Sequence, residues 1–404
     1  MQKFFNPNSI LLVLLLSLFC LTFTQNVSAG WTEQTGSGSR AWREIASSSD
    51  GVKLAATVAG SYVYTSVDSG VNWTAQTALS AFDWWPIASS SDGVKLAIAE
   101  YGGSVFTSIN SGVNWTERTG AGSRWWYGLT SSSDGVKLAG VVDGSGYIYT
   151  SANSGANWTQ QTGSGSRYWH GITSSSDGVK LASPVVNGYI YTSTDSGVNW
   201  TEQTGAGSRF WFGIASSSDG VKLAAIVNGG YIYTSTDSGV NWTEQTGAGS
   251  RNWYSITSSS DGTKLAATVD GGYIYVSTDS GVNWTQQTEA GLRAWRGITS
   301  SSDGTKLGAV VSNGYIYTSV SNVAPVASSV TISGTPNISQ TLTGTYTYTD
   351  ADSDPEGTST FRWLRDDVAI DGATSLTYTT VQADVGTTLK FEVTPVASTG
   401  TTPG

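Results

Sequence analysis

The sequence predicts an all-β fold whose larger part is a repeated four-stranded unit. Self-comparison finds Asn-Trp-Thr six times and Ser-Ser-Ser-Asp-Gly seven times, at spacings of 42 or 43 residues. Within the repeat at 200–241, four alternating or apolar segments are separated by Gly- and Ser-rich turns. Four strands in about 40 residues are typical of one β-propeller blade, so seven repeats predict a seven-bladed β-propeller.

The phase of the repeat predicts how the ring closes. In the same repeat, strands are expected at 200–204, 209–215, 222–227 and 231–234. Residues 31–35, Trp-Thr-Glu-Gln-Thr, match the first of these strands, whereas the last repeat ends at 315–319 without one. We therefore expect the N-terminal strand to complete the last blade, which removes an exposed sheet edge.

The first 29 residues have the pattern of a secretory signal. Lys3 is followed by an apolar run at 10–23, and Val-Ser-Ala at 27–29 places small residues at a cleavage position after Ala29. Fourteen apolar residues are too few for a membrane-spanning helix. We expect a secreted, periplasmic or cell-surface protein without disulfides, because Cys20 is the only cysteine and lies in this segment.

The overall charge excludes some partners. A net charge of −10 and 12% charged residues do not provide the clustered basic surface that nucleic acids require, nor do they favour an anionic membrane. The expected partner is therefore an extracellular protein or glycan, and the chain is expected to be a monomer.

One turn carries a family resemblance. Ser193-Thr-Asp-Ser-Gly-Val-Asn-Trp200 resembles the Asp-box, Ser-x-Asp-x-Gly-x-x-Trp, of sialidase-like (BNR) propellers. Six copies fit, with the acidic or amide position at Asp68, Asn110, Asn153, Asp195, Asp237 and Asp279, and tryptophan at Trp73, Trp115, Trp158, Trp200, Trp242 and Trp284. In that family the motif is structural and lies away from the ligand, so the resemblance implies a binding face at the opposite end of the blades.

The repeat places arginine and aromatic residues on that opposite face. The equivalent arginines are Arg40, Arg124, Arg167, Arg209, Arg251 and Arg293, and Trp42, Trp84, Trp126, Trp169, Trp211, Trp253 and Trp295 are expected beside them. The positions flanking these tryptophans vary between copies and include Trp125, Tyr127, Tyr168, His170, Phe210, Phe212 and Tyr254. One interpretation is packing between blades; the other is a site for a protein segment or a glycan.

The sequence predicts no catalytic residue, cofactor or metal in the propeller. The arginines are symmetric copies, and the Arg-Ile-Pro segment of sialidases is missing. The alternative is a carbohydrate-active enzyme, such as a glycoside hydrolase, that uses Asp83 and Glu100, two carboxylates that break the repeat. A looser similarity to the propellers of photosystem II assembly factors, which hold a partner protein, favours a binding or scaffold role.

The repeat ends near residue 320, after which a linker is expected at 321–327. Alternating segments at 328–397 and Trp363 resemble bacterial Ig-like surface modules. Asp350, Asp352 and Asp354 form an acidic run that is either a solvated loop or a Ca²⁺ site. Residues 398–404 have the composition of another linker, so a longer multi-module protein is one interpretation.

Overall fold

The computed structural model describes residues 30–320, 325–350 and 355–398. Within these residues every regular element is a β-strand or a short 3₁₀ turn, and no helix among them is long and apolar enough to span a bilayer. The chain divides into two compact units, one within Ala29–Ser321 and the other within Asn322–Gly404. The predicted signal segment at 1–29 lies outside the described residues, as do 321–324 of the predicted linker and 399–404 of the predicted tail.

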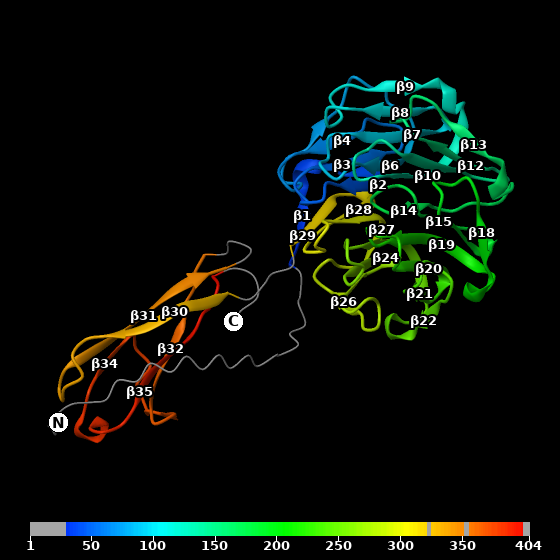
Figure 1. The fold of residues 1–404 in the computed structure, drawn as a ribbon. Helices are drawn as coiled ribbons and strands as arrows, with labels where there is room; N and C mark the ends of the chain where they lie inside the picture. The colour runs from blue at the N-terminus through cyan, green and yellow to red at the C-terminus, as the bar shows by residue number, and fades with distance from the viewer. Residues whose placement is uncertain (1–29, 321–324, 351–354, 399–404) are drawn as a thin grey trace. The chain divides into compact units, whose positions relative to one another are not determined.

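Four-stranded antiparallel sheets, numbered here from 1 to 7 in chain order, make up the larger unit (Figure 1). Sheet 1 contains β2 (Arg40–Ser47), β3 (Leu54–Val58), β4 (Tyr64–Ser66) and β5 (Thr74–Ala75). Sheet 2 contains β6 (Trp84–Ser89), β7 (Leu96–Gly103), β8 (Val105–Ser108) and β9 (Thr116–Arg118). Sheet 3 contains β10 (Arg124–Ser131), β11 (Leu138–Val142), β12 (Ile148–Ser151) and β13 (Thr159–Gln161). Sheet 4 contains β14 (Thr173–Ser174), β15 (Leu181–Pro184), β17 (Ile190–Ser193) and β18 (Thr201–Gln203). Sheet 5 contains β19 (Arg209–Ser216), β20 (Leu223–Gly230), β21 (Ile232–Ser235) and β22 (Thr243–Gln245).

The last two sheets bring the two ends of this unit together. Sheet 6 contains β23 (Arg251–Ser258), β24 (Leu265–Gly272), β25 (Ile274–Ser277) and β26 (Thr285–Gln287), and sheet 7 contains β27 (Arg293–Ser300), β28 (Lys306–Gly314), β29 (Ile316–Val320) and β1 (Gly30–Gln34). Strand β1 pairs with β29 over its whole length, and Trp31 lies opposite Ser319. The predicted pairing of the N-terminal strand with the last repeat is therefore confirmed.

Backbone hydrogen bonds also link each sheet to the next. The amide of Ser49 donates to the carbonyl of Ser91 at 2.7 Å, and the amide of Ser302 donates back to the carbonyl of Ser49 at 2.7 Å. The same bond joins Ser91 to Ser133, Ser133 to Ser176, Ser176 to Ser218, Ser218 to Ser260 and Ser260 to Ser302. Since this chain of bonds returns to its first member, the sheets form a closed ring.

The core lies between neighbouring sheets. Trp42 packs on Leu54 and Tyr64 of its own sheet and on Val310 and Ile316 of sheet 7. Its equivalents in the other repeats share this burial, and all seven side chains (Trp42, Trp84, Trp126, Trp169, Trp211, Trp253 and Trp295) are at most 1% exposed. The expectation that these tryptophans stand on a ligand-binding face is wrong, because their side chains point between the sheets, where large aromatic rings bury the most apolar surface.

Turns at one end of the sheets are held by short polar side chains. Asp68 accepts hydrogen bonds from the amide of Asn72 at 2.9 Å and from its side chain at 2.7 Å, while the indole of Trp73 donates to the carbonyl of Gly70 at 2.7 Å. The two bonds from Asn72, together with one from the hydroxyl of Ser66, hold the pKa of Asp68 below its ordinary value. In sheet 3 the Oδ1 of Asn153 accepts from the backbone amide of Asn157 at 2.8 Å and from the hydroxyl of Ser151 at 3.1 Å. At this position of the repeat, aspartate and asparagine therefore bond to the backbone of their own turn, as turn-forming residues do.

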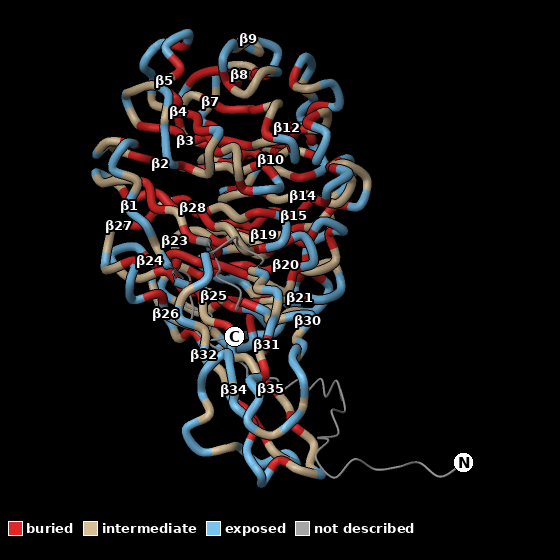
Figure 2. The backbone as a smooth tube through the Cα atoms, turned by 90° about the vertical axis from the view of Figure 1, so that its left-hand side faces the viewer, coloured by how far each residue is buried: buried red, intermediate tan, exposed pale blue. Residues whose placement is uncertain are grey.

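The smaller unit consists of two antiparallel sheets. One contains β30 (Val326–Ser333), β31 (Thr341–Thr349) and β34 (Thr377–Thr379), and the other contains β32 (Thr360–Arg365), β33 (Val368–Ala369) and β35 (Leu389–Thr394). Much of this unit is exposed or intermediate in Figure 2, and the buried residues of its strands lie in β31, β32 and β35. Trp363 is fully buried with Leu342, Leu389 and Phe391. Of the predicted calcium ligands, Asp352 and Asp354 lie outside the described residues.

Candidate functional site

A bulge in the first strand of most sheets directs one side chain towards the centre of the ring. The pairing of the first and second strands shifts register directly after the core tryptophan in sheets 1, 2, 3, 5, 6 and 7. A bulge re-aims the side chain that it carries. The residue after each core tryptophan therefore faces its counterparts, and these residues are called the central ring: Arg43, Trp85, Tyr127, His170, Phe212, Tyr254 and Arg296.

The central ring is a nearly continuous series of side chains whose aromatic rings contact one another at tilted or edge-on angles. Ring centroids lie 5.1 Å apart for Trp85 and Tyr127, 4.1 Å for Tyr127 and His170, 4.0 Å for His170 and Phe212, and 5.1 Å for Phe212 and Tyr254. The guanidinium of Arg43 lies 4.8 Å from the centroid of Trp85, and that of Arg296 lies 4.5 Å from the centroid of Tyr254. A cavity of about 140 Å³, lined by all of these residues except Arg296, lies at this level.

Glu44 is the acidic residue that lines this cavity. Its Oε2 accepts a hydrogen bond from the amide of Ile87, in the neighbouring sheet, at 3.1 Å. Part of the side chain faces the cavity, but burial among the first strands raises the pKa of Glu44 to about 8, and the bond from Ile87 offsets only some of this. At neutral pH the carboxyl is therefore mostly protonated. The sequence offered a signal for this residue, because four of the six equivalent positions are glycine.

The aromatic side of the cavity is uncharged at neutral pH. Burial lowers the pKa of His170 to about 4, and its Nδ1 lies 2.6 Å from the carbonyl oxygen of Phe212. Burial also raises the pKa of Tyr127 and of Tyr254. A general-base role for His170 would need a protonatable ring near pH 7, so in the central ring His170 acts as an uncharged aromatic group that packs between Tyr127 and Phe212.

Charged groups gather where the central ring changes from aromatic to basic. Arg296 pairs with Asp270 at 2.6 Å, and Arg43 lies 3.9 Å from Asp83. Two atoms there, Nε of Arg43 and Oδ1 of Asp83, are buried without a hydrogen-bond partner in the described residues. Buried polar atoms of this kind favour a ligand or a water that completes their bonding.

Exposed aromatic side chains lie beside the central ring on three consecutive sheets. Trp125, Tyr168 and Phe210 each precede a core tryptophan, and they are 60%, 53% and 41% exposed. Trp125 also lies 5.4 Å from the ring of Tyr101, which stacks on Trp85. These three residues are called the aromatic arc. Exposed aromatics on one side of a rigid mouth are typical of a recognition surface.

Comparison with solved structures identifies the fold. The chain is similar to YCF48 from Cyanidioschyzon merolae at 16% identity with a TM-score of 0.58, covering 72% of this chain and 99% of the other. It is also similar to the beta-propeller domain of Cps50 (Swd1) from Myceliophteria thermophila at 11% identity with a TM-score of 0.59, covering 72% and 99%. The larger unit is a β-propeller.

Other propellers of similar fold differ in what they do. A second YCF48 structure is bound to a D1 peptide, at 14% identity and a TM-score of 0.58, covering 72% of this chain and 97% of the other. A GH74 xyloglucanase from Xanthomonas campestris matches at 14% identity and a TM-score of 0.57, covering 78% and 59%. At these identities the likeness shows the fold alone. No protein-family model and no curated protein matches the sequence.

The six predicted arginines occupy a different part of the propeller from the central ring. The guanidinium of Arg124 lies 4.3 Å from the centroid of Tyr149, and its Nε donates to the carbonyl of Ala121 at 3.0 Å. The same pair of contacts recurs for Arg40, Arg167, Arg209, Arg251 and Arg293. Each arginine is thus held within its own blade, stacked on tyrosine.

Of the two carboxylates considered for catalysis, Glu100 lies in β7, and Asp83 directly precedes β6, the neighbouring strand of the same sheet. Glu100 in β7 pairs with Trp84, the residue that follows Asp83. Burial raises the pKa of Glu100, and the charges of Glu117 and Asp83 add to this. Among the described residues no cluster of three or more His, Cys, Asp or Glu could hold a metal ion.

Replacing Glu44 by glutamine is expected to remove a loss of stability at alkaline pH. The pKa of Glu44 is about 8 in the folded chain and ordinarily 4.5, so between these values the folded state binds a proton that the unfolded state releases. Rising pH then lowers the free energy of unfolding by about 1.4 kcal/mol per pH unit until it passes the folded-state pKa. Between pH 6.5 and 8, urea unfolding should show the wild type losing about 2 kcal/mol more than Glu44→Gln.

The pH window and the control isolate this group. His170 titrates mainly below pH 6.5, because its pKa is lowered, and it stabilises the fold in the opposite direction, with stability lost as the pH falls. Glu289→Gln changes an exposed glutamate and should keep the wild-type loss. An equal loss in the wild type and in Glu44→Gln would show that Glu44 is ionised and hydrated.

Proposed function

We propose that this chain is a secreted, non-catalytic binding protein: a seven-bladed propeller of the Asp-box type, joined to an Ig-like module, that binds a protein segment or a glycan at its channel mouth. The observation that carries the proposal is the aromatic arc. Trp125, Tyr168 and Phe210 keep 60%, 53% and 41% of their surface exposed, although the same position is alanine in sheets 1 and 7. The propeller framework is thus constant while this surface differs from blade to blade.

The chemistry of the mouth suits an extended ligand with alternating apolar faces and polar edges. The aromatic arc provides flat apolar surfaces, and carboxylates stand close to them: Asp143 accepts a hydrogen bond from Tyr101 at 2.9 Å, and Asp83 is 42% exposed. Peptide backbones and sugar rings both present donors that such carboxylates accept. The YCF48 structure bound to a D1 peptide is a precedent for a peptide ligand on this fold.

Binding should be tested with the mature protein on a glycan array and by pull-down from an extracellular protein fraction. Trp125→Ala/Tyr168→Ala/Phe210→Ala is expected to weaken binding of the ligand so identified at least tenfold, since exposed aromatic anchors carry much of the energy of such surfaces. The matched control is Val198→Ala/Val240→Ala/Val282→Ala, which removes exposed apolar groups from the Asp-box turns of sheets 4 to 6 and should leave binding unchanged.

Two outcomes would replace the proposal. Equal affinity of the wild type and the arc variant would place the ligand elsewhere. Hydrolysis of a bound glycan that disappears in Asp83→Asn or Glu100→Gln would make the propeller an enzyme that uses these two carboxylates.

A further inference from the structure

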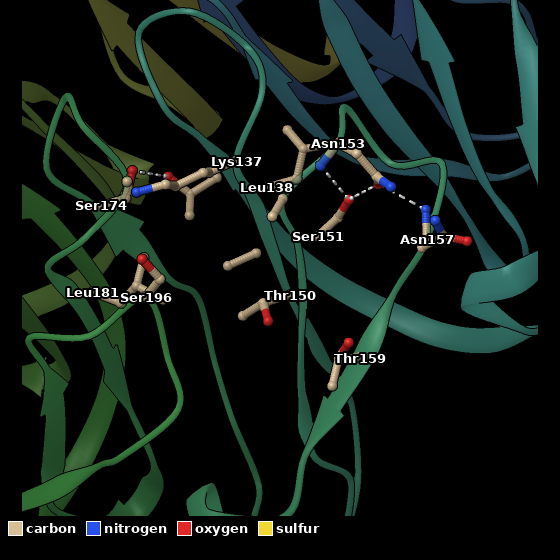
Figure 3. Close-up of a pocket in the computed structure, with 14 residues that line it drawn as sticks. Lys137, Leu138, Thr150, Ser151, Asn153, Asn157, Thr159, Ser174, Leu181 and Ser196 are labelled. Carbon is tan, nitrogen blue, oxygen red and sulfur yellow. Dashed lines mark hydrogen bonds between the residues drawn. The ribbon is translucent and has the colours of Figure 1, made fainter.

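A second cavity lies at the other end of the propeller, between sheets 3 and 4. It has a volume of about 250 Å³. Figure 3 shows Leu181 and Ser196 of sheet 4 facing Thr150 and Thr159 of sheet 3 across it. Neither the central ring nor the aromatic arc contributes to its lining, so it is a separate site.

The repeat supplies an internal comparison for this cavity. The corresponding gaps between sheets 4 and 5 and between sheets 5 and 6 each have a volume of about 10 Å³. The residue directly before the turn aspartate or asparagine lines all three gaps. It is Thr194 or Thr236 in the small gaps and Ala152 in the large one. Among these three gaps the opening is therefore particular to the one between sheets 3 and 4.

Two polar side chains that line this cavity, Asn157 and Lys137, make no hydrogen bond from their terminal nitrogen within the described residues. In sheets 1, 4, 5 and 6 the asparagine of Asn-Trp-Thr donates from its side chain to the turn aspartate at 2.6–2.7 Å. In sheet 3 the aspartate is replaced by Asn153, and the side-chain amide of Asn157 makes no hydrogen bond within the described residues. Lys137, which follows the Ser-Ser-Ser-Asp-Gly turn, also lines the cavity, and its ammonium makes no hydrogen bond within the described residues, as is true of Lys180 beside one of the small gaps.

These groups surround an apolar floor. Leu138 and Leu181, 5% and 4% exposed, form its base with Ala139, and the residues that line the cavity include no aspartate or glutamate. An apolar surface with amide, hydroxyl and ammonium groups at its edge matches the C–H face and the hydroxyl groups of a sugar ring. We propose that this cavity binds a single sugar residue.

The site is tested by saturation-transfer NMR with D-glucose, D-galactose, N-acetyl-D-glucosamine and D-glucuronic acid as probes. The wild type should give a signal with at least one probe. Ala152→Thr/Asn153→Asp restores the Ser-Thr-Asp turn of sheets 4 to 6 and should reduce that signal at least fivefold. The matched control, Ile109→Thr/Asn110→Asp, makes the same change in sheet 2, away from the cavity, and should keep the signal.

Each result decides for or against the proposal. Signals from none of the four probes, or an unchanged signal in Ala152→Thr/Asn153→Asp, would overturn it. The variant Trp125→Ala/Tyr168→Ala/Phe210→Ala should keep the sugar signal, and its loss there would assign the sugar to the aromatic arc. Because the arc variant also tests the proposed function, failure of one site can be told apart from failure of the other.

Discussion

Replacing residues 30–36 with a flexible Gly-Ser segment is expected to lower the melting temperature of the propeller by more than about 10 °C. Strand β1 pairs with β29 over five residue positions, and each backbone bond contributes about 0.5–1.5 kcal/mol. Trp31 packs 6.2 Å from Trp295, and Gln34 donates to Thr318 at 2.6 Å. Burial of an indole adds about 2–3 kcal/mol, and about 2–4 °C is lost per kcal/mol in a domain of this size.

Differential scanning calorimetry measures this directly. Thr32→Ser/Thr35→Ser alters exposed side chains of the same segment and should leave the melting temperature within about 2 °C of the wild type. An unchanged melting temperature in the Gly-Ser variant would mean that sheet 7 is stable with three strands and that the ring does not depend on β1.

Adjacent tryptophans in β10 are expected to respond in opposite ways to truncation. Trp126 is fully buried and packs edge-on against Tyr149 and at a tilt against Trp158, with ring centroids 5.5 Å and 5.7 Å away, so Trp126→Ala should cost about 3–5 kcal/mol of stability. Trp125 is 60% exposed, so Trp125→Ala should change stability by less than about 0.5 kcal/mol while weakening ligand binding.

Urea unfolding of the two variants tests the orientation of the first strands. A shift of one residue along a strand moves every side chain to the opposite face. A large loss for Trp125→Ala together with a small loss for Trp126→Ala would therefore reverse the assignment of core and binding surface in sheet 3.

Much of the fold follows from the sequence because the repeat is so regular. Strand positions follow from alternation and from turn residues, and the pairing of β1 with β29 follows from the phase of one five-residue segment, 31–35. The segments expected around Trp363 are also strands, because apolar alternation over a short run leaves few other structures.

The candidate site was less predictable because a repeat indicates which residues are equivalent in each blade but not which way their side chains point. Arg124 and Trp126 both recur in nearly every blade, yet one stacks on a tyrosine of its own sheet and the other is buried between sheets. Tyr127 faces the channel because of the bulge after Trp126, and no residue pattern in the sequence predicts this bulge. Glu44 was detectable as a break in the repeat, but its protonation depends on burial that only the packed strands reveal.

The pairing of residue 32 with residue 318 tests the closed ring most directly. Thr32 lies opposite Thr318 in the β1–β29 register, and Cys20 is the only cysteine, so a Thr32→Cys/Thr318→Cys variant that also carries Cys20→Ser contains just two thiols. Mild oxidation should form an intramolecular disulfide that makes the denatured chain migrate faster on a non-reducing gel, whereas Thr32→Cys/Thr192→Cys should not. Failure of the first pair to crosslink would contradict the closed ring and the central site that it creates.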